Sequence, residues 1–147
     1  MILGIIGDEK RMQGTVISDA VNLASRIQDV TKLYKANIVI SQATFVKLEN
    51  PSDYRFLGRV KVKGKDQAVA LFEIFSADSV EKREKKTATQ GNFERALMAF
   101  AQRDFGEAET LFEKVTESDP EDETAKVFLE RISEMRIAEK RDFLTSL

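Results

Sequence analysis

The spacing of apolar residues predicts strands in the first half of the chain and helices in the second. Residues 2–7 (ILGIIG) form a short apolar run that is typical of a buried strand. A helix is then expected from Ser18 or Asp19, either of which is a good N-cap, to about Lys35. Its apolar residues recur every three or four positions and therefore form one stripe: Ala20, Leu23, Ile27, Val30 and Tyr34.

Three further strands are predicted after this helix. Residues 37–41 (NIVIS) are apolar and β-branched, and residues 42–49 are expected to form one or two helical turns. Residues 56–63 end in alternating valines and lysines, as in a strand with one buried face. A polar turn then leads into a return strand over residues 68–75. The resulting order, β-α-β-β-β, predicts an α+β fold for this half of the chain.

A change of composition marks a predicted domain boundary. Residues 78–90 are polar and rich in charge, which is typical of a linker or of the solvated start of a helix. We therefore expect one domain over residues 1–77 and an all-α segment over residues 91–147.

The all-α segment contains three predicted helices, over residues 93–103, 105–118 and 123–141. Residues 89–122 resemble one tetratricopeptide repeat, a two-helix unit of about 34 residues. A generic helical hairpin is the alternative. Because a single repeat obtains most of its core from its neighbours, this tail is expected to pack on something else, with a protein partner as one candidate. The resemblance rests on Ala96, Asp104, Phe105, Ala108, Phe112 and Pro120.

Composition narrows the classes of function. Hydrophobic residues make up 42% of the chain and charged residues 33%, which is ordinary for a soluble globular protein. The net charge of −2 favours neither nucleic acid nor an anionic membrane as a partner. The absence of cysteine excludes disulfides and fits a cytoplasmic location, and no apolar run is long enough to span a bilayer. The absence of histidine removes the commonest general base and any imidazole-ligated metal site.

Candidate chemistry is concentrated in residues 15–26 (TVISDAVNLASR). On a helix, Asn22 and Arg26 lie four positions apart and project together from the shoulder of the apolar stripe. The planar guanidinium of Arg26 suits a phosphate, because its fork of donors neutralises charge and defines geometry together. In the structural alternative, Asn22 caps a neighbouring loop and Arg26 pairs with a surface carboxylate.

Three segments resemble the class III adenylate and guanylate cyclases. They are residues 4–27, 37–41 and 54–75, which occur in the family's order, so that the resemblance covers residues 2–75. The combination of VNLASR with a downstream VKGK hairpin is its most specific part. The resemblance implies a partial ferredoxin-like nucleotide cyclase domain. It also implies a phosphorus–oxygen lyase that converts ATP into cyclic AMP and pyrophosphate.

The resemblance assigns roles to four residues. Asn22 and Arg26 match the family's catalytic pair, which orients the ribose and stabilises charge on the α-phosphate. Lys63 matches a lysine that contacts the terminal phosphates, and Thr15 matches a position that reads the purine. Many bacterial adenylate cyclases resemble this chain in having threonine there, so the resemblance favours ATP over GTP. Asp19 is expected to be a helix N-cap rather than a catalytic base.

The resemblance also implies parts that this sequence does not supply. Family members use two Mg²⁺ (or Mn²⁺) ions held by two aspartates on strands upstream of everything present here, and neither Asp8 nor Asp53 matches them. Family sites lie between the subunits of a head-to-tail dimer. The chain is therefore expected to bind ATP as a homodimer or with a complementing cyclase half, and to be inactive alone. The alternative is a non-catalytic dimerisation module whose helical tail recruits a protein.

Overall fold

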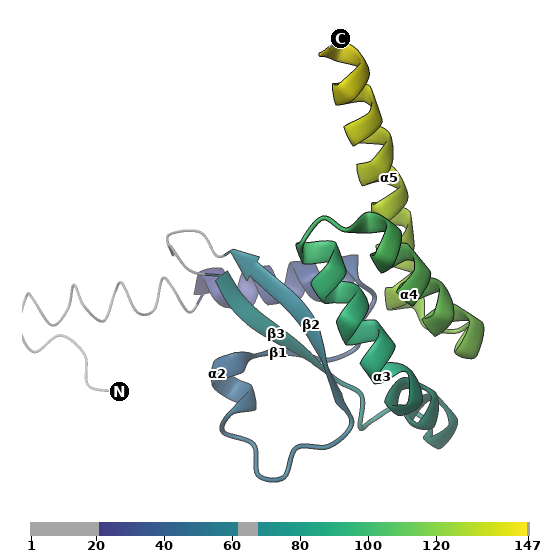
Figure 1. Ribbon diagram of the computed structural model, residues 1–147. Helices are drawn as coiled ribbons and strands as arrows, with labels where there is room; N and C mark the ends of the chain where they lie inside the picture. Colours follow the sequence, from purple (N-terminus) through teal and green to yellow (C-terminus); the bar gives the residue numbers. More distant parts are fainter. Residues whose placement is uncertain (1–20, 62–67, 147) are drawn as a thin grey trace, which may run out of the picture.

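The computed structural model describes residues 21–61 and 68–146, and within them the protein has an α+β fold (Figure 1). Three strands form one antiparallel sheet in the order β1-β3-β2, and long helices account for most of the remaining residues. The α+β class predicted from the sequence is therefore confirmed. The first expected strand, residues 2–7, lies outside the described residues.

The sheet follows the predicted order of strands. β1 (Val39–Ser41) and β2 (Tyr54–Lys61) both pair with β3 (Ala68–Ile74), which is therefore the central strand. A β-bulge shifts the register of β2 between Phe56 and Gly58. Gly58 has a φ of +111°, a backbone conformation that glycine adopts without strain, so the bulge depends on that residue.

The two faces of the sheet are packed differently. Arg55 and Leu57 of β2 and Leu71 and Glu73 of β3 are buried on the face that contacts the long helices. On the opposite face, Phe72 stacks against Phe45 of the short helix α2 (Gln42–Phe45), with ring centroids 4.2 Å apart. The alternation along each strand thus places two charged side chains, Arg55 and Glu73, on the buried face.

Four long helices accompany the sheet in the described part of the chain. The N-terminal helix is described over residues 21–33, and it is followed later in the chain by α3 (Val80–Ala101), α4 (Phe105–Ser118) and α5 (Glu123–Thr145). The helices α3, α4 and α5 each begin at a capping residue. The side chains of Ser79, Asp104 and Asp122 accept a hydrogen bond from a main-chain N–H in the first turn of α3, α4 and α5, respectively.

The start of α3 differs from the sequence prediction. Residues 78–90, predicted to be a linker or the solvated start of a helix, contribute the N-cap and the first half of α3, which begins at Val80 and not at Phe93. Two of its polar residues face inward: Thr89 is buried, and Lys86 pairs with carboxylates of the sheet region. The segment is helical because its charges have partners in the fold. The division into domains at this point remains a prediction.

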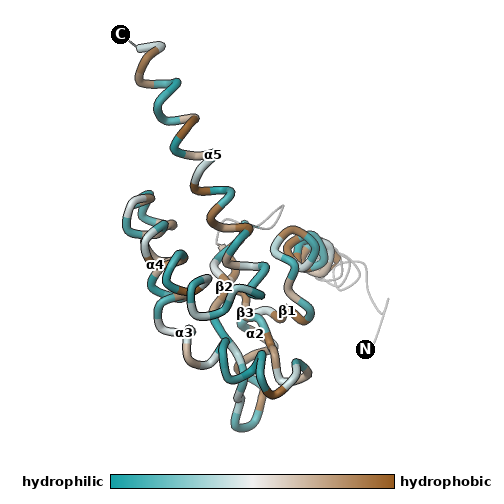
Figure 2. Tube along the Cα trace, turned by 90° about the vertical axis from the view of Figure 1, so that its right-hand side faces the viewer, coloured by the Kyte–Doolittle hydropathy of each residue, from teal (hydrophilic) through white to brown (hydrophobic). Residues whose placement is uncertain are grey.

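One hydrophobic core joins the sheet to the helices. One cluster contains Val30 of the N-terminal helix, Tyr34 just after it, Leu57 and Leu71 of the sheet, and the aromatic residues of α3–α5. Phe128 of α5 is central to this cluster, since its ring contacts four others: Tyr34, Phe93, Phe100 and Phe112. α3 and α4 lie side by side, whereas the last turns of α5 extend away from the body (Figures 1 and 2).

Candidate functional site

The N-terminal helix holds two of the four predicted site residues. Asn22 is half-buried and Arg26, one turn later, is exposed. On the neighbouring side of the same helix, Ile27 packs against the core and Val30 is buried within it. Arg26 therefore projects toward solvent from a helix that the core holds in place, a suitable arrangement for a cation that meets an external phosphate.

The other two predicted residues, Thr15 and Lys63, lie outside the described residues, as does Asp19. Their assignments to the purine, to the terminal phosphates and to the helix N-cap stay predictions.

A groove runs beside the N-terminal helix, between it, α2 and the start of β3. Its volume is about 380 Å³, and Leu23 lines it from the N-terminal helix. The first residues of β3, Ala68 and Val69, line the opposite side. The groove thus lies against the helix that carries Asn22 and Arg26. Its remaining lining residues are Ser41, Gln42, Ala43 and Val46.

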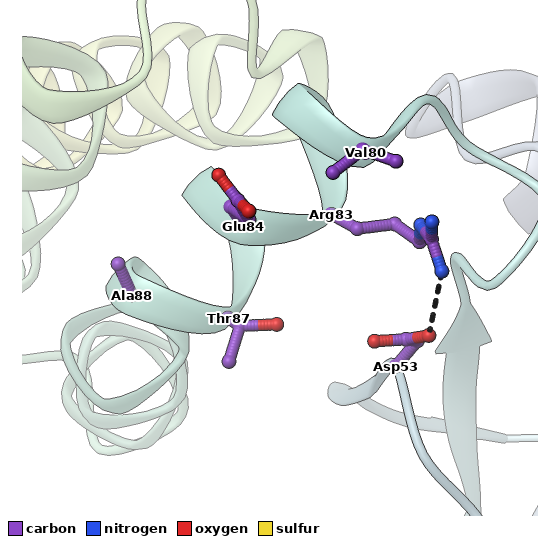
Figure 3. A pocket seen from close by; sticks show the side chains of 6 residues that line it. All are labelled: Asp53, Val80, Arg83, Glu84, Thr87 and Ala88. Atoms are coloured by element: carbon purple, nitrogen blue, oxygen red, sulfur yellow. Dashed lines mark ion pairs between the residues drawn. The ribbon is translucent and has the colours of Figure 1, made fainter.

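No metal centre is visible in the described part of the chain. Among residues 21–61 and 68–146, no group of three or more histidine, cysteine, aspartate or glutamate side chains is arranged to hold a metal ion. The described residues therefore do not form a magnesium site with three or more such ligands. Asp53 instead pairs with Arg83 of α3, at 3.7 Å, at the edge of an open pocket of about 430 Å³ (Figure 3). This pocket carries charges of both signs and no group with an assigned chemical role.

The structure contains a buried ionic network that the sequence analysis missed. The Arg55 guanidinium is fully buried, and its Nε donates to Glu73 Oε1 at 2.6 Å. Its two Nη atoms donate to the Asp122 carboxylate at 2.7 and 3.0 Å, a bidentate pair. The guanidinium also lies 3.8 Å from the centre of the Phe93 ring. One side chain of β2 therefore contacts β3, α3 and the start of α5.

Lys86 extends this network to the first turns of α3. Its ammonium lies 2.8 Å from Glu73 Oε2 and 2.7 Å from Asp78 Oδ2. Asp122 has a second function, because its Oδ1 also accepts the Ala125 N–H as the N-cap of α5. Burial of these charges is tolerated because each has an oppositely charged partner within hydrogen-bonding distance.

The pKa values of the network follow from these contacts. Burial alone would lower the pKa of Arg55, but the hydrogen bonds and charge of Asp122, with the charge of Glu73, raise it above the ordinary value. Burial would raise the pKa of Asp122, but Arg55 holds it below the ordinary range. Asp119 behaves oppositely: burial and the nearby charge of Asp122 raise its pKa.

One sequence signal did point to the network. Glu73 occupies an inward position of the predicted return strand, next to Leu71, and Arg55 directly precedes the predicted strand over residues 56–63 and lies at an inward position of β2, next to Leu57. Two opposite charges at inward positions of paired strands indicate an ion pair, because an unpaired charge there is costly. Asp122 lies 67 residues after Arg55, so nothing local in the sequence pointed to it.

Comparison with known proteins relates this chain to adenylate cyclases. It is 32% identical over 133 residues to the terminal-differentiation-specific adenylate cyclase of Dictyostelium discoideum, a match that covers 88% of the chain. It is 42% identical over 77 residues to an adenylate cyclase of Anabaena cylindrica, and 32% identical over 73 residues to adenylate cyclase 1 of Rhizobium meliloti. Each of these two matches covers 50% of the chain. No protein-family model and no solved structure matches.

These similarities support an adenylate cyclase-related function for the chain. It spans 6%, 15% and 11% of the lengths of the Dictyostelium, Anabaena and Rhizobium proteins, respectively. A match over 88% of the chain includes parts of both the sheet and α3–α5, so both regions have counterparts within the Dictyostelium cyclase. None of the described helices is long and apolar enough to cross a membrane.

Proposed function

We propose that this chain is the C-terminal part of a class III adenylate cyclase catalytic domain, and that it supplies nucleotide-contacting residues to a site shared with a second cyclase half. The observation that carries the proposal is the similarity to three adenylate cyclases. The position of Arg26 supports it, because this arginine is exposed on a helix whose neighbouring side is held by the core.

Cyclisation of ATP requires that the ribose be positioned against the α-phosphate and that the charge on the phosphates be neutralised. The ribose 3′-oxygen of ATP attacks the α-phosphorus, its proton leaves, and the bond to pyrophosphate breaks. Arg26 would stabilise the charge that develops on the α-phosphate, and Asn22 would orient the ribose for attack. Thr15 would hydrogen-bond to the adenine edge and favour ATP over GTP, and Lys63 would neutralise the terminal phosphates.

The second half of the site would come from another polypeptide segment. Divalent metal ions in such a site neutralise phosphate charge, and the aspartates that hold them would belong to the complementing half. Among the described residues of this chain, no three or more such side chains are grouped to hold a metal ion. Under this proposal the chain is inactive alone and works as a homodimer of longer subunits or beside a complementing half, in the cytoplasm.

We assign α3 and α4 to a tetratricopeptide-like unit within this proposal. They pack as consecutive helices with Ala96 and Ala108 buried, and Phe93 and Phe112 fill the space between them with ring centroids 5.6 Å apart. Small residues permit close approach of the two helices. α5 would cap the unit through Phe128 and Ile132. Ile137, Phe143 and Leu144 near its end are exposed and available to a protein partner.

Complementation tests the catalytic proposal. The 147-residue chain is mixed with an adenylate cyclase domain that keeps its metal-binding aspartates but has its own catalytic asparagine and arginine replaced by alanine. Cyclic AMP formation from Mg-ATP is then measured. We expect activity in the mixture and none in either component alone. Robust turnover by the isolated chain would contradict inactivity alone. Lack of activity in the mixture, together with no binding of an ATP analogue, would overturn the proposal.

The same assay separates the alternative, a non-catalytic dimerisation and protein-interaction module. That function is favoured by the exposed apolar end of α5. It predicts that Arg26→Ala and Lys63→Ala change nothing in the complemented assay, and that deletion of residues 90–147 abolishes the biological role.

A further inference from the structure

The end of the N-terminal helix is held by α5 mainly through Tyr34, beside an exposed ion pair of Lys35 with Glu123 at 3.9 Å. The Tyr34 ring stacks on Phe128, with centroids 4.6 Å apart and an angle of 11° between the ring planes. The Thr124 hydroxyl donates to the Tyr34 main-chain carbonyl at 2.7 Å, and Arg131 donates to the Tyr34 hydroxyl. Tyr34 and Thr124 are both buried. Three different chemical groups of Tyr34 are thus engaged by a single helix.

The bond from Thr124 acts as a helix cap. The last carbonyls of a helix have no partner within it, and Tyr34 immediately follows the helical residues 21–33. Its N–H still donates to the Val30 carbonyl at 2.9 Å, after which Lys35 turns into the left-handed region with a φ of +55°. Thr124, 90 residues further along the chain, therefore satisfies a carbonyl at the end of the helix that carries Arg26.

A helix is stiff over the distance that separates this anchor from the candidate site. Arg26 precedes Tyr34 by eight residues, or roughly 12 Å at the rise of an α-helix. Between them Val30 is buried and Ile27 contacts the core, so the helix moves as a unit with its end. A displacement of α5 against Tyr34 is therefore carried to Arg26.

From this geometry we infer that Tyr34, Thr124 and Arg131 are positioning residues of the cyclase site. Through Tyr34, α5 orients the helix that presents Asn22 and Arg26, so that a ligand or protein acting on the helical tail acts on catalysis. The inference rests on the proposed function, but the mechanical link between α5 and the N-terminal helix can be measured without it.

Three threonine variants test the link. Thr124→Val keeps the shape of the side chain and removes the donor, and Thr124→Ser keeps the donor. Thr110→Val is the matched control, because the Thr110 hydroxyl also bonds a main-chain carbonyl, that of Gly106, but is exposed on α4. The full chain is studied by hydrogen–deuterium exchange of the peptide over residues 28–36. Thermal melts confirm folding of each variant.

We expect Thr124→Val to speed exchange in that peptide about tenfold, since it leaves a buried carbonyl without a partner. In the complemented assay kcat should fall by about the same factor with KM little changed. Thr124→Ser should restore both values, and Thr110→Val should alter neither. Tyr34→Phe, which keeps the ring stack and removes the hydroxyl, should give a smaller effect of the same kind.

The outcomes separate this inference from the proposed function. If Arg26→Ala lowers activity but Thr124→Val and Tyr34→Phe leave kcat unchanged, the positioning role is wrong and the proposed function stands. If Arg26→Ala has no effect on activity, the proposed function fails, and the positioning role fails with it. In that case, exchange in residues 28–36 still decides whether α5 holds the N-terminal helix. Unchanged exchange in folded Thr124→Val would overturn the link.

Discussion

Arg26 and Arg55 occupy two regions that use a guanidinium in opposite ways. Arg26 is exposed on the N-terminal helix, beside a groove, whereas Arg55 is fully buried between the sheet and α5. The five donors of an arginine can serve either a ligand or the fold. Those of Arg55 engage Glu73 and Asp122, so Arg55 is unavailable to a substrate. The exposed arginine is the one suited to meet a phosphate.

The two regions also depend on the rest of the molecule to different degrees. Arg55 joins residues from β3, α3 and the start of α5, and changing Glu73 or Asp122 removes one of the two carboxylates that compensate its buried charge. Arg26 depends on the orientation of its own helix. Substitutions should therefore affect mainly stability in one region and mainly activity in the other, which the following predictions test in order of decreasing effect.

The largest expected effect is that of Asp122→Asn on stability. The change removes the negative charge opposite Arg55, and we expect the free energy of unfolding to fall by about 3–5 kcal/mol. Urea denaturation monitored by circular dichroism measures this loss. Asp142→Asn, the same change at an exposed position of α5, is the control and should stay within about 0.5 kcal/mol of the parent. A loss below about 1 kcal/mol for Asp122→Asn would contradict the assigned network.

Arg26→Ala should lower the activity and leave the stability almost unchanged. We expect complemented cyclase activity to fall about 100-fold, as for loss of one donor to a developing charge, while the free energy of unfolding changes by less than about 0.5 kcal/mol. Arg141→Ala, at an exposed position of α5, is the matched control and should leave both quantities unchanged. A destabilisation by Arg26→Ala comparable to that of Asp122→Asn would remove the distinction between the two regions.

The stability of the protein should depend on pH in two ways, because the pKa values of Asp119 and Asp122 are shifted in opposite directions. The pKa of Asp119 is raised, so its unfavourable contribution is relieved as the pH falls from 7. The pKa of Asp122 is lowered, so its stabilisation is complete above the unfolded value of about 4 and is lost as the pH falls through its folded pKa. We therefore expect stability to rise slightly toward pH 5 and to fall steeply below pH 4. Thermal melts across this range at constant ionic strength measure the profile.

Asp119→Asn should have the smallest effect, and in the opposite direction to Asp122→Asn. Asparagine keeps an oxygen for the Glu121 N–H, which donates to Asp119 Oδ1, and removes a charge near Asp122. We expect a gain of up to about 1 kcal/mol at pH 7 that disappears toward pH 4. If this variant is less stable than the parent at neutral pH, the burial of the Asp119 charge and its repulsion by Asp122 do not destabilise the fold.

Local patterns in the sequence predicted most of the elements. The range expected for α4, residues 105–118, is the one observed, and the return strand over residues 68–75 corresponds to β3 (Ala68–Ile74). The paired projection of Asn22 and Arg26 from the shoulder of a helix also followed from spacing alone. α3 was the main error, because the pattern after Asp78 is polar and its hydrophobic contacts begin only near Thr89 and Phe93.

The sequence by itself determined the features that depend on a few neighbouring residues. These are the periodicity of helices and strands, the capping residues, and the spacing of Asn22 and Arg26 along one helix. Only the tertiary structure decided that Arg55 would meet Asp122 and that Thr124 would cap the end of the N-terminal helix. These contacts join residues 67 and 90 positions apart. Their energy comes from burial and from the mutual satisfaction of polar groups, which exist only after the sheet and helices have packed together.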